Sequence, residues 1–156
     1  MEKRVKEEVK QILTSYLGTN KRRKTPERFA ILDAIYSMNG HFTMEQLSEY
    51  LDNHHFHVSR ATLYSSIKLF YELRLVIPHH LQVGTMYEAC YVNGDHIHQI
   101  CTVCGKVTEV KSPALMAASE ETKLKRFRKN AFSLYIYGIC STCQAKITRM
   151  KGKANK

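Results

Sequence analysis

Two pairs of cysteines constrain this chain most, because each pair has the spacing at which proteins present two thiolates to one metal ion. The first pair is Cys101 and Cys104, and the second is Cys140 and Cys143. Four thiolates presented in this way suit tetrahedral zinc in a closed structural site. The 35 residues between the pairs exceed the spacing of a simple zinc ribbon, so the metal must join the two ends of one small domain. We therefore predict a structural Zn²⁺ site on these four residues.

Two other uses of the cysteines are a thioredoxin-like dithiol and buried free thiols. A redox pair accounts for one C-x-x-C segment at a βα junction and leaves the second segment unexplained. Structural disulfides are rare in the reducing cytosol. The metal interpretation explains both segments at once.

Length and charge limit the kind of protein this is. The 156 residues suffice for one or two compact domains, and the net charge of +10 favours a polyanionic partner such as nucleic acid or an acidic membrane surface. No apolar run approaches the roughly 20 residues that span a bilayer. Residues 1–10 are charged throughout, unlike a secretory signal. We expect a cytoplasmic protein with no membrane partner.

The first 92 residues have the pattern of a winged helix-turn-helix domain, in which the last helix is shaped to enter the major groove of DNA. An ordinary small α+β domain is the alternative. Apolar periodicity, capping residues and β patterns define the expected elements. They are helices over 2–17 and 26–38, with Thr25 as the second N-cap, a short helix after Thr43, a helix after Ser59, and strands over 75–80 and 86–92.

The remaining residues, 93–156, have the pattern of a second, smaller α/β domain. We expect a strand over 107–111, a helix over 113–127 and a strand over 131–139. The tail, residues 146–156, carries five basic residues and no acidic ones, and we expect it to fray. The predicted fold is thus α+β, with domains over 1–92 and 93–156. Net charge is +2 for the first and +8 for the second.

A second group of metal-binding side chains precedes the first cysteine pair. His96 and His98 alternate along a strand and therefore project to one face. Possible companions are His41, Glu88, Cys90 and Glu109, and such donors suit Fe(II), Mn(II) or Zn(II). The eight histidines of the chain also allow a chance cluster. We expect the others to be solvated or loop residues: His54, His55, His57, His79 and His80.

The chain resembles the ferric uptake regulator superfamily of metal-responsive bacterial repressors along nearly its whole length. Each motif alone is weak, and their ordered combination is specific. The motifs lie at residues 24–28, 40–43, 59–64, 96–101, 105–107 and 134–140. The resemblance implies an N-terminal winged-helix domain, a C-terminal α/β dimerisation domain and structural zinc on the four cysteines.

The resemblance also implies a regulatory metal held by residues of both domains and of the hinge between them. Matched position by position, its ligands are His41, Glu88, His96, His98 and Glu109. A metal that binds only the closed arrangement of the domains stabilises it, and DNA that prefers the same arrangement then binds more tightly. The metal is thus a corepressor. A homodimer matches the two half-sites of a palindromic operator in double-stranded DNA.

The identity of the regulatory metal stays open between iron and zinc. Glu88 resembles the iron branch of the family, whereas Cys90 resembles the thiolate ligand of the zinc-uptake branch and is an alternative ligand. Glu109 stands where the peroxide-sensing branch tends to have aspartate. Our first prediction is an iron-responsive repressor that is not an enzyme, and our second is a zinc-responsive repressor. Two other classes are a zinc metalloenzyme and a structural zinc scaffold.

For DNA binding, the resemblance places Tyr64 against bases. Thr62 and Lys68 then face the same groove or its phosphates. The basic segment around Arg23 is expected to hold phosphates or enter the minor groove. The predicted DNA-binding residues are Arg23, Arg28, Ser59, Arg60, Thr62, Tyr64 and Lys68.

Overall fold

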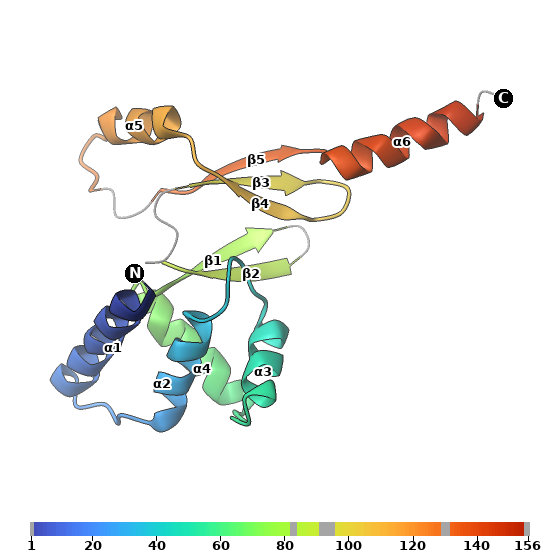
Figure 1. Ribbon diagram of the computed structural model, residues 1–156. Coiled ribbons are helices and arrows are strands. Elements are labelled where there is room, and N and C mark those ends of the chain that lie inside the picture. Colours follow the sequence, from blue (N-terminus) through green and yellow to red (C-terminus); the bar gives the residue numbers. More distant parts are fainter. Residues whose placement is uncertain (1, 82–83, 91–95, 129–131, 155–156) are drawn as a thin grey trace. The chain divides into compact units, whose positions relative to one another are not determined.

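The computed structural model describes residues 2–81, 84–90, 96–128 and 132–154 (Figure 1). The chain divides into two compact units, Met1–Gly94 and Asp95–Lys156, which are treated one at a time below. Unit 1 contains α1 (Glu2–Thr19), α2 (Pro26–Ile35), α3 (Met44–Asn53), α4 (Arg60–Glu72), β1 (Val76–Leu81) and β2 (Gly84–Ala89). Unit 2 contains β3 (Ile97–Cys101), β4 (Val107–Val110), α5 (Pro113–Glu121), β5 (Leu134–Gly138) and α6 (Ser141–Ala154). No described helix is long and apolar enough to cross a bilayer.

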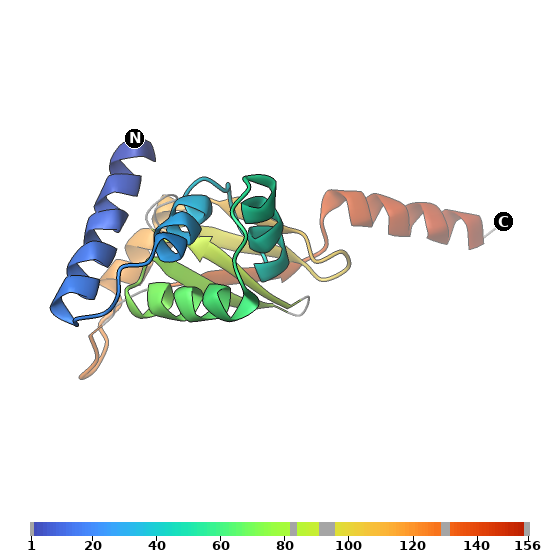
Figure 2. The same cartoon turned by 90° about the horizontal axis from the view of Figure 1, so that it is seen from below.

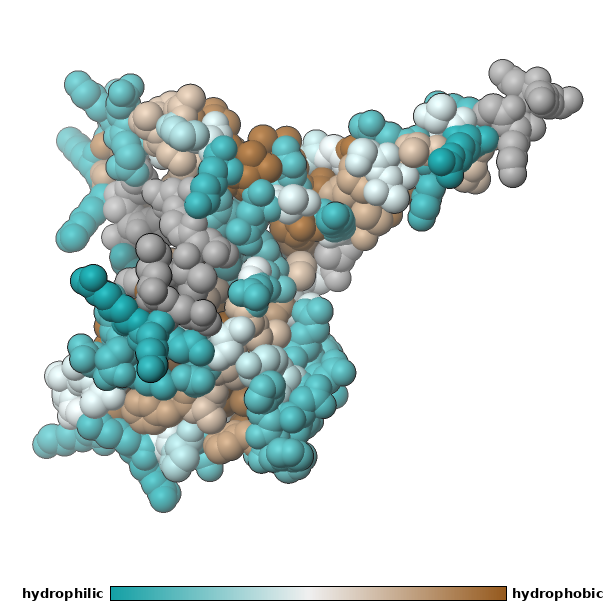
Figure 3. Space-filling model, viewed as in Figure 1, coloured by the Kyte–Doolittle hydropathy of each residue, from teal (hydrophilic) through white to brown (hydrophobic). Residues whose placement is uncertain are grey.

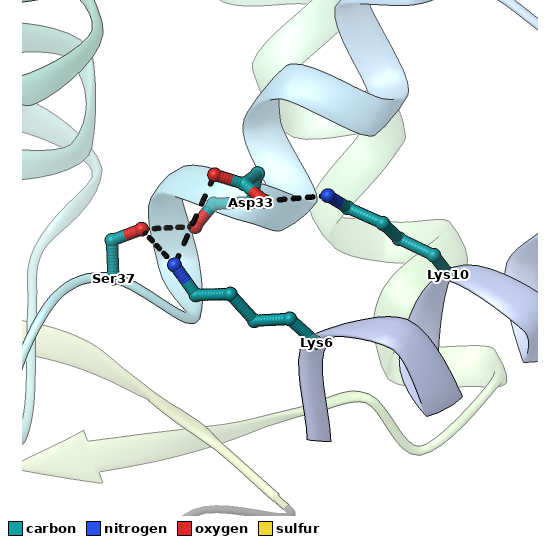
Figure 4. A network of polar contacts seen from close by, with 4 residues as sticks. All are labelled: Lys6, Lys10, Asp33 and Ser37. Atoms are coloured by element: carbon teal, nitrogen blue, oxygen red, sulfur yellow. Dashed lines mark hydrogen bonds and ion pairs between the residues drawn. The ribbon is translucent and has the colours of Figure 1, made fainter. Parts of the chain in front are cut away.

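The first helix, α1, is part of the core of unit 1. Its apolar positions repeat at helical spacing, and Val9, Leu13 and Leu17 are fully buried. Polar contacts to α2 add to this packing (Figure 4). Lys10 Nζ lies 2.7 Å from a carboxylate oxygen of Asp33, and Lys6 Nζ donates to Ser37 Oγ at 2.6 Å. The predicted helix is confirmed, and it is firmly packed.

Helix α2 ends at Ile35, three residues before the predicted end. Tyr36 is the C-cap: its N–H still donates to the carbonyl of Leu32 at 3.1 Å, and its buried hydroxyl donates to the carbonyl of Leu75 at 2.8 Å. Thr25 occupies the N-cap position, but its side chain makes no capping hydrogen bond. Pro26, whose fixed φ suits the first turn, therefore favours a helix start here more than the Thr25 side chain does.

The two helices of the helix-turn-helix are both capped by the predicted residues. Thr43 begins α3 with a capping box, in which its hydroxyl accepts from the Gln46 backbone and the Gln46 amide oxygen accepts from the Thr43 backbone. Ser59 begins α4 by accepting from the backbone N–H of Thr62. Leu63, Ile67 and Phe70 form the buried stripe of α4, as the periodicity predicted.

A two-stranded hairpin completes unit 1. Strands β1 and β2 are antiparallel, with His79 opposite Met86 and Ile77 opposite Glu88. An isolated bridge between Phe42 and Tyr87 ties the segment before α3 to β2. Figures 1 and 2 show α2, α3 and α4 gathered on one side of this hairpin, the arrangement of a winged helix. The predicted end of the second strand, at residues 91–92, lies outside the described residues.

Unit 2 is built on a three-stranded sheet in the order β4-β3-β5. Strand β3 pairs antiparallel with β4 and parallel with β5. Ile97 and Ile100 of the central strand are buried. The winged-helix and small α/β architectures are therefore both as predicted.

Two predictions for unit 2 were wrong. Helix α5 stops at Glu121 and not at Phe127. It buries none of its residues, and the cationic run 123–128 that follows offers no apolar stripe to extend it. The tail does not fray over 146–154, because α6 continues from the second cysteine pair, where the Gln144 N–H donates to the carbonyl of Cys140 at 2.9 Å.

Candidate metal centres and nucleic-acid interface

The four predicted zinc ligands meet at one end of the unit 2 sheet. Cys101 ends β3, Cys104 lies in the following turn, Cys140 follows β5 and Cys143 is in the first turn of α6. Their sulfur atoms all lie within 4.8 Å of one another, and Cys104 Sγ is 3.9 Å from Cys140 Sγ. Tetrahedral zinc with bonds of about 2.3 Å needs sulfur atoms about 3.8 Å apart. The four side chains therefore fit a closed zinc site.

The turn after β3 shapes the first half of this site. Gly105 has a positive φ of 72°, the left-handed conformation that glycine adopts without strain. Its N–H donates to the carbonyl of Cys101 at 2.9 Å, and the Cys101 N–H donates to the carbonyl of Lys106 at 3.0 Å. This tight turn brings Cys104 back beside Cys101.

The thiols of this cluster differ in acidity. The backbone N–H groups of Cys140 and Cys104 donate to the sulfur of Cys101 and lower its pKa to about 6. Interaction with the Cys140 side chain, and then burial, raise the pKa of Cys143 to about 12. One thiolate thus forms readily while a neighbour resists ionisation. A bound divalent cation removes this conflict, because it stabilises all four thiolates together.

A separate cluster of two histidines and a carboxylate lies in unit 1. Glu88 of β2 is only 3% exposed, and its Oε2 lies 3.1 Å from His79 Nε2 and 3.5 Å from His41 Nε2. The rings of His41 and His79 meet edge to face, with centroids 5.1 Å apart. The bridge between Phe42 and Tyr87 holds His41 next to β2. Nitrogen and oxygen donors in this arrangement suit Fe(II), Mn(II) or Zn(II).

The prediction that His79 is a solvated or loop residue was wrong. It is 1% exposed and hydrogen-bonded to Glu88. The signal that could have found it is the hairpin register: His79 pairs with Met86, so it shares a face with Glu88 two residues further along β2. The other histidines in that group, His54, His55, His57 and His80, are exposed as predicted.

A third cluster lies in unit 2, at the start of the sheet. His96 Nε2 and His98 Nε2 are 3.0 Å apart, so both rings project to one side as predicted. Glu109 stands directly opposite His98 on β4, and the ring of Tyr135 on β5 stacks against His98 at 5.3 Å. This cluster again offers imidazole and carboxylate donors.

Cys90 lies just beyond β2 and belongs to none of the metal-capable groups formed by the described residues. Burial, and then the nearby charge of Glu88, raise the pKa of its thiol to about 12. Its N–H donates to the carbonyl of Leu75 at 3.1 Å. Cys90 therefore stands outside the groups of imidazole and carboxylate donors that the described residues form.

Helix α4 presents a polar face opposite its buried stripe. Tyr64 is 55% exposed, and Arg60 and Lys68 are also exposed. The Ser59 hydroxyl is 2.9 Å from Thr62 Oγ1 as well as accepting the capping bond, so both hydroxyls help to form the start of the helix. Tyr64, Arg60 and Lys68 are spaced four residues apart, so they lie along one side of the helix.

The basic segment 21–24 joins α1 to α2 and is exposed throughout. The Arg22 guanidinium lies over the ring of Tyr16, 5.5 Å from its centroid. Arg28, which is half-buried, donates to the carbonyl of Arg23 at 3.1 Å. These contacts with Tyr16 and Arg28 hold the segment at its two ends. The Arg23 side chain remains exposed.

Two residues near Tyr64 were missed by the sequence analysis. Burial, followed by the proximity of Tyr64 and Glu45, raises the pKa of Tyr87, which places all three side chains in one neighbourhood. Tyr87 also stacks on Phe42. Hydrogen bonds from its own backbone and from Thr43 lower the pKa of Glu45, with a smaller contribution from Arg60. No spacing rule links β2 to α4, so only the tertiary fold reveals this group.

Comparison with known proteins shows to which protein family this chain belongs. A family model described as the ferric uptake regulator family matches residues 19–137. The chain belongs to the ferric uptake regulator family. Members are metal-responsive transcriptional regulators and not enzymes, so the metalloenzyme alternative is excluded.

Two relatives illustrate the range within this family. The chain is 30% identical over 141 residues to the peroxide operon regulator of Bacillus subtilis, covering 89% of this chain and 95% of that protein. It is 29% identical over 124 residues to the ferric uptake regulation protein of Neisseria meningitidis serogroup A, covering 78% of this chain and 86% of that protein. The resemblance of this ferric uptake regulator family member extends across both units.

Solved structures of the family support the fold. The ferric uptake regulator of Helicobacter pylori aligns with a TM-score of 0.71 at 18% identity, covering 89% of this chain and 93% of that chain. The ferric uptake regulator of Vibrio cholerae aligns with a TM-score of 0.59 at 25% identity, covering 81% of this chain and 98% of that chain. The described elements therefore form the winged-helix and α/β architecture of the family.

Proposed function

We propose that this family member is a homodimeric repressor in which a divalent metal, most simply Fe(II), controls DNA binding. The observation that carries the proposal is the Glu88 carboxylate, which is buried between His41 and His79. Burial of a carboxylate is costly unless it is paired, and a cation bound by Glu88 and the two imidazoles would add to the pairing with His79. The proposed structural metal is Zn²⁺ on Cys101, Cys104, Cys140 and Cys143.

The proposed regulatory ligands are His41 and Glu88 from unit 1, and His96, His98 and Glu109 from unit 2, with His79 added to the set. Each cluster by itself offers too few donors for a saturated site. An ion that takes donors from both would stabilise one arrangement of the units by its differential affinity. DNA that prefers this arrangement would then bind more tightly, which makes the metal a corepressor.

Iron is favoured over zinc by the donor chemistry. The clusters offer nitrogen and oxygen atoms, and Cys90 is in none of the metal-capable groups that the described residues form. A thiolate ligand would shift selectivity toward zinc. Zinc control remains the second candidate, since imidazole and carboxylate also bind Zn(II).

The proposed dimer uses unit 2. Within the described residues, β5 pairs with β3 on one side and leaves its other edge without a strand. Ile136, Tyr137 and Ile139 at and beside this strand are exposed. An apolar sheet edge of this kind favours pairing with another chain. Sedimentation velocity should give the mass of a dimer, and Ile136→Glu should shift it toward the monomer.

The proposed DNA reader is α4, with Tyr64 against bases and Arg60 and Lys68 against bases or phosphates. Thr62 and Ser59 set the start of the helix, and Arg23 and Arg28 bring the basic segment to the backbone. Tyr64→Phe should lower the affinity for DNA duplexes selected for binding by about tenfold, because one good side-chain contact to a base contributes roughly 1–3 kcal/mol.

One titration tests the metal proposal. Protein that retains its zinc is freed of other metal and then titrated with Fe(II), Mn(II) or Zn(II) without oxygen. A pool of random-sequence duplexes is selected for binding, and fluorescence anisotropy follows the affinity. We expect Fe(II) to raise affinity for selected duplexes at least tenfold. Indifference to all three metals would overturn the corepressor model.

Histidine variants locate the response. His96→Ala with His98→Ala should abolish the metal effect and leave the fold and the zinc content unchanged. The matched control is His55→Ala with His80→Ala, which removes two exposed histidines and should respond as the unmodified protein does. Equal responses in the two double variants would contradict the proposed ligand set.

A further inference from the structure

We propose that α6 is a second DNA-binding surface, which contacts the phosphate backbone of duplex DNA. This inference rests on the proposed function, in which the chain binds duplex DNA. It concerns a helix that the sequence analysis expected to fray, and it assigns a role to the large positive charge of unit 2.

The charge of α6 is of one sign. From Ser141 to the last residue the chain has five basic and no acidic side chains. Lys146, Arg149 and Lys151 are exposed. Figure 3 shows hydrophilic residues along this helix, with pale and tan ones between them, on the visible face. In contrast, α1 has four basic and three acidic residues, so its charges largely cancel.

The exposure of α6 makes a purely structural role a poor explanation. Between residues 141 and 151, Cys143 is buried and Ile147 half-buried, while the other side chains are exposed. Lys146 and Arg149 are three residues apart, so their like charges are neighbours on the helix surface and destabilise it. A helix of 14 residues is marginal in water without packing. A polyanion that neutralises these charges would stabilise it.

The start of α6 is fixed by the cysteine cluster. Cys140 precedes the helix and Cys143 lies in its first turn, and Gln144 Nε2 donates to the carbonyl of Ile139 at 2.9 Å. Figures 1 and 2 show the helix running on from β5, away from the sheet of unit 2. A metal-anchored helix presents its cations in a set arrangement, which lowers the entropy cost of binding.

The spacing of the cations suits a row of phosphates. Lys146 and Arg149 are separated by about 4.5 Å along the helix axis, at about 1.5 Å per residue, and share one face, whereas Lys151 lies on another side of the helix. Duplex DNA carries one charge per roughly 1.7 Å of its axis, so several phosphates face this length. The exposed apolar side chains of the described part of α6 are few, with Met150 the largest, whereas helices that bind membrane surfaces carry a broad apolar face. Duplex DNA is therefore the favoured polyanion.

The test replaces the three exposed cations of α6 by glutamine, as K146Q/R149Q/K151Q, in the full-length zinc-loaded protein. Affinity for a 30-base-pair random duplex is measured over a range of salt concentrations. We expect the slope of log affinity against log salt to fall by about 0.9 for each phosphate that the variant no longer neutralises, and affinity at low salt to fall about tenfold. Selection among duplex sequences should not change, because phosphate contacts carry no direct sequence information.

The matched control is K123Q/K125Q/R126Q, which removes the same charge from an exposed loop of the same unit. Equal reductions in affinity for the two triple variants would show an effect of net charge alone and overturn the proposal. An unchanged slope in the α6 variant would do the same. The charge-conserving variant K146R/R149K/K151R should retain binding, and circular dichroism and zinc content check that all variants are folded.

The same proteins separate the other partners that a basic helix could have. Single-stranded RNA and vesicles of anionic lipid are offered in place of the duplex. A reduction in affinity confined to RNA or to vesicles would overturn the DNA proposal in favour of that partner. If the unmodified protein binds no duplex with any metal, the proposed function itself fails. If it binds and the α6 variant binds equally well, only the inference about α6 fails.

Discussion

Unit 1 and unit 2 are held together by different means. In unit 1, 19 buried apolar residues from all four helices and both strands form one continuous cluster. In unit 2, the buried apolar residues of the described part are Ile97, Ile100, Cys101 and Cys143, and α5 buries none. Half of that short set consists of cysteines of the metal-capable cluster. The core of a domain of about 60 residues supplies little stability, and the four cysteines form a cluster that could hold a stabilising metal ion.

Removal of one cysteine should have the largest effect and should be confined to unit 2. Cys104→Ser leaves three thiolates, and metal binding in such sites is coupled to folding with about 10–16 kcal/mol. We expect loss of zinc and of protection from hydrogen exchange in unit 2, while unit 1 stays protected. The control is Cys90→Ser, which should keep its zinc. A Cys104→Ser protein with an intact, zinc-loaded unit 2 would contradict the comparison.

Truncation of the core should have the second largest effect and should be confined to unit 1. Leu13 is fully buried between α1 and the rest of the domain, so Leu13→Ala should cost about 2–5 kcal/mol of unfolding free energy. Chemical denaturation of unit 1 measures this cost. Leu115→Ala, on the exposed surface of α5, should cost far less. Similar losses of unfolding free energy for Leu13→Ala and Leu115→Ala would contradict the view that unit 1 depends on an apolar core and unit 2 does not.

Loss of a helix cap should have a smaller effect on unit 1. Ser59→Ala removes the acceptor for the Thr62 N–H at the start of α4, with an expected cost of about 1 kcal/mol. Thermal unfolding gives the change. The matched variant is Ser65→Ala, whose hydroxyl donates to the Thr62 carbonyl inside the helix and caps nothing. A larger cost for Ser65→Ala than for Ser59→Ala would refute the capping role.

The smallest expected effect comes from the polar contacts between α1 and α2. The ion pair between Lys10 and Asp33 is substantially exposed, so Lys10→Ala should cost at most about 1 kcal/mol. The cost should shrink further at high salt because the charges are screened. Lys3→Ala, on the exposed side of α1, serves as the reference. A cost comparable to that of Leu13→Ala would show that polar contacts, and not the apolar core, secure α1.

Local signals in the sequence account for much of the fold. Capping residues such as Thr43 and Ser59 and the apolar stripe of α4 are features within one turn or two, and they placed those elements correctly. The two cysteine pairs predicted a cluster whose sulfur atoms do lie together. The ends of α2 and α5 were misplaced. Where α2 ends, the Tyr36 hydroxyl bonds to Leu75, 39 residues away in the chain, and α5 lacks a buried face.

The sequence by itself determined which functional side chains this protein has and how they are spaced. These are the paired thiols, the alternating histidines, the cationic segment and the apolar stripes of the helices. These depend on spacing along one strand or one helix, and spacing can be read directly. Tertiary structure alone decided that His79 lies buried against Glu88 and that Tyr87 and Glu45 lie near Tyr64. Each of these depends on which distant segments pack together, and the free energy of that packing is set by the whole fold and not by neighbours in the chain.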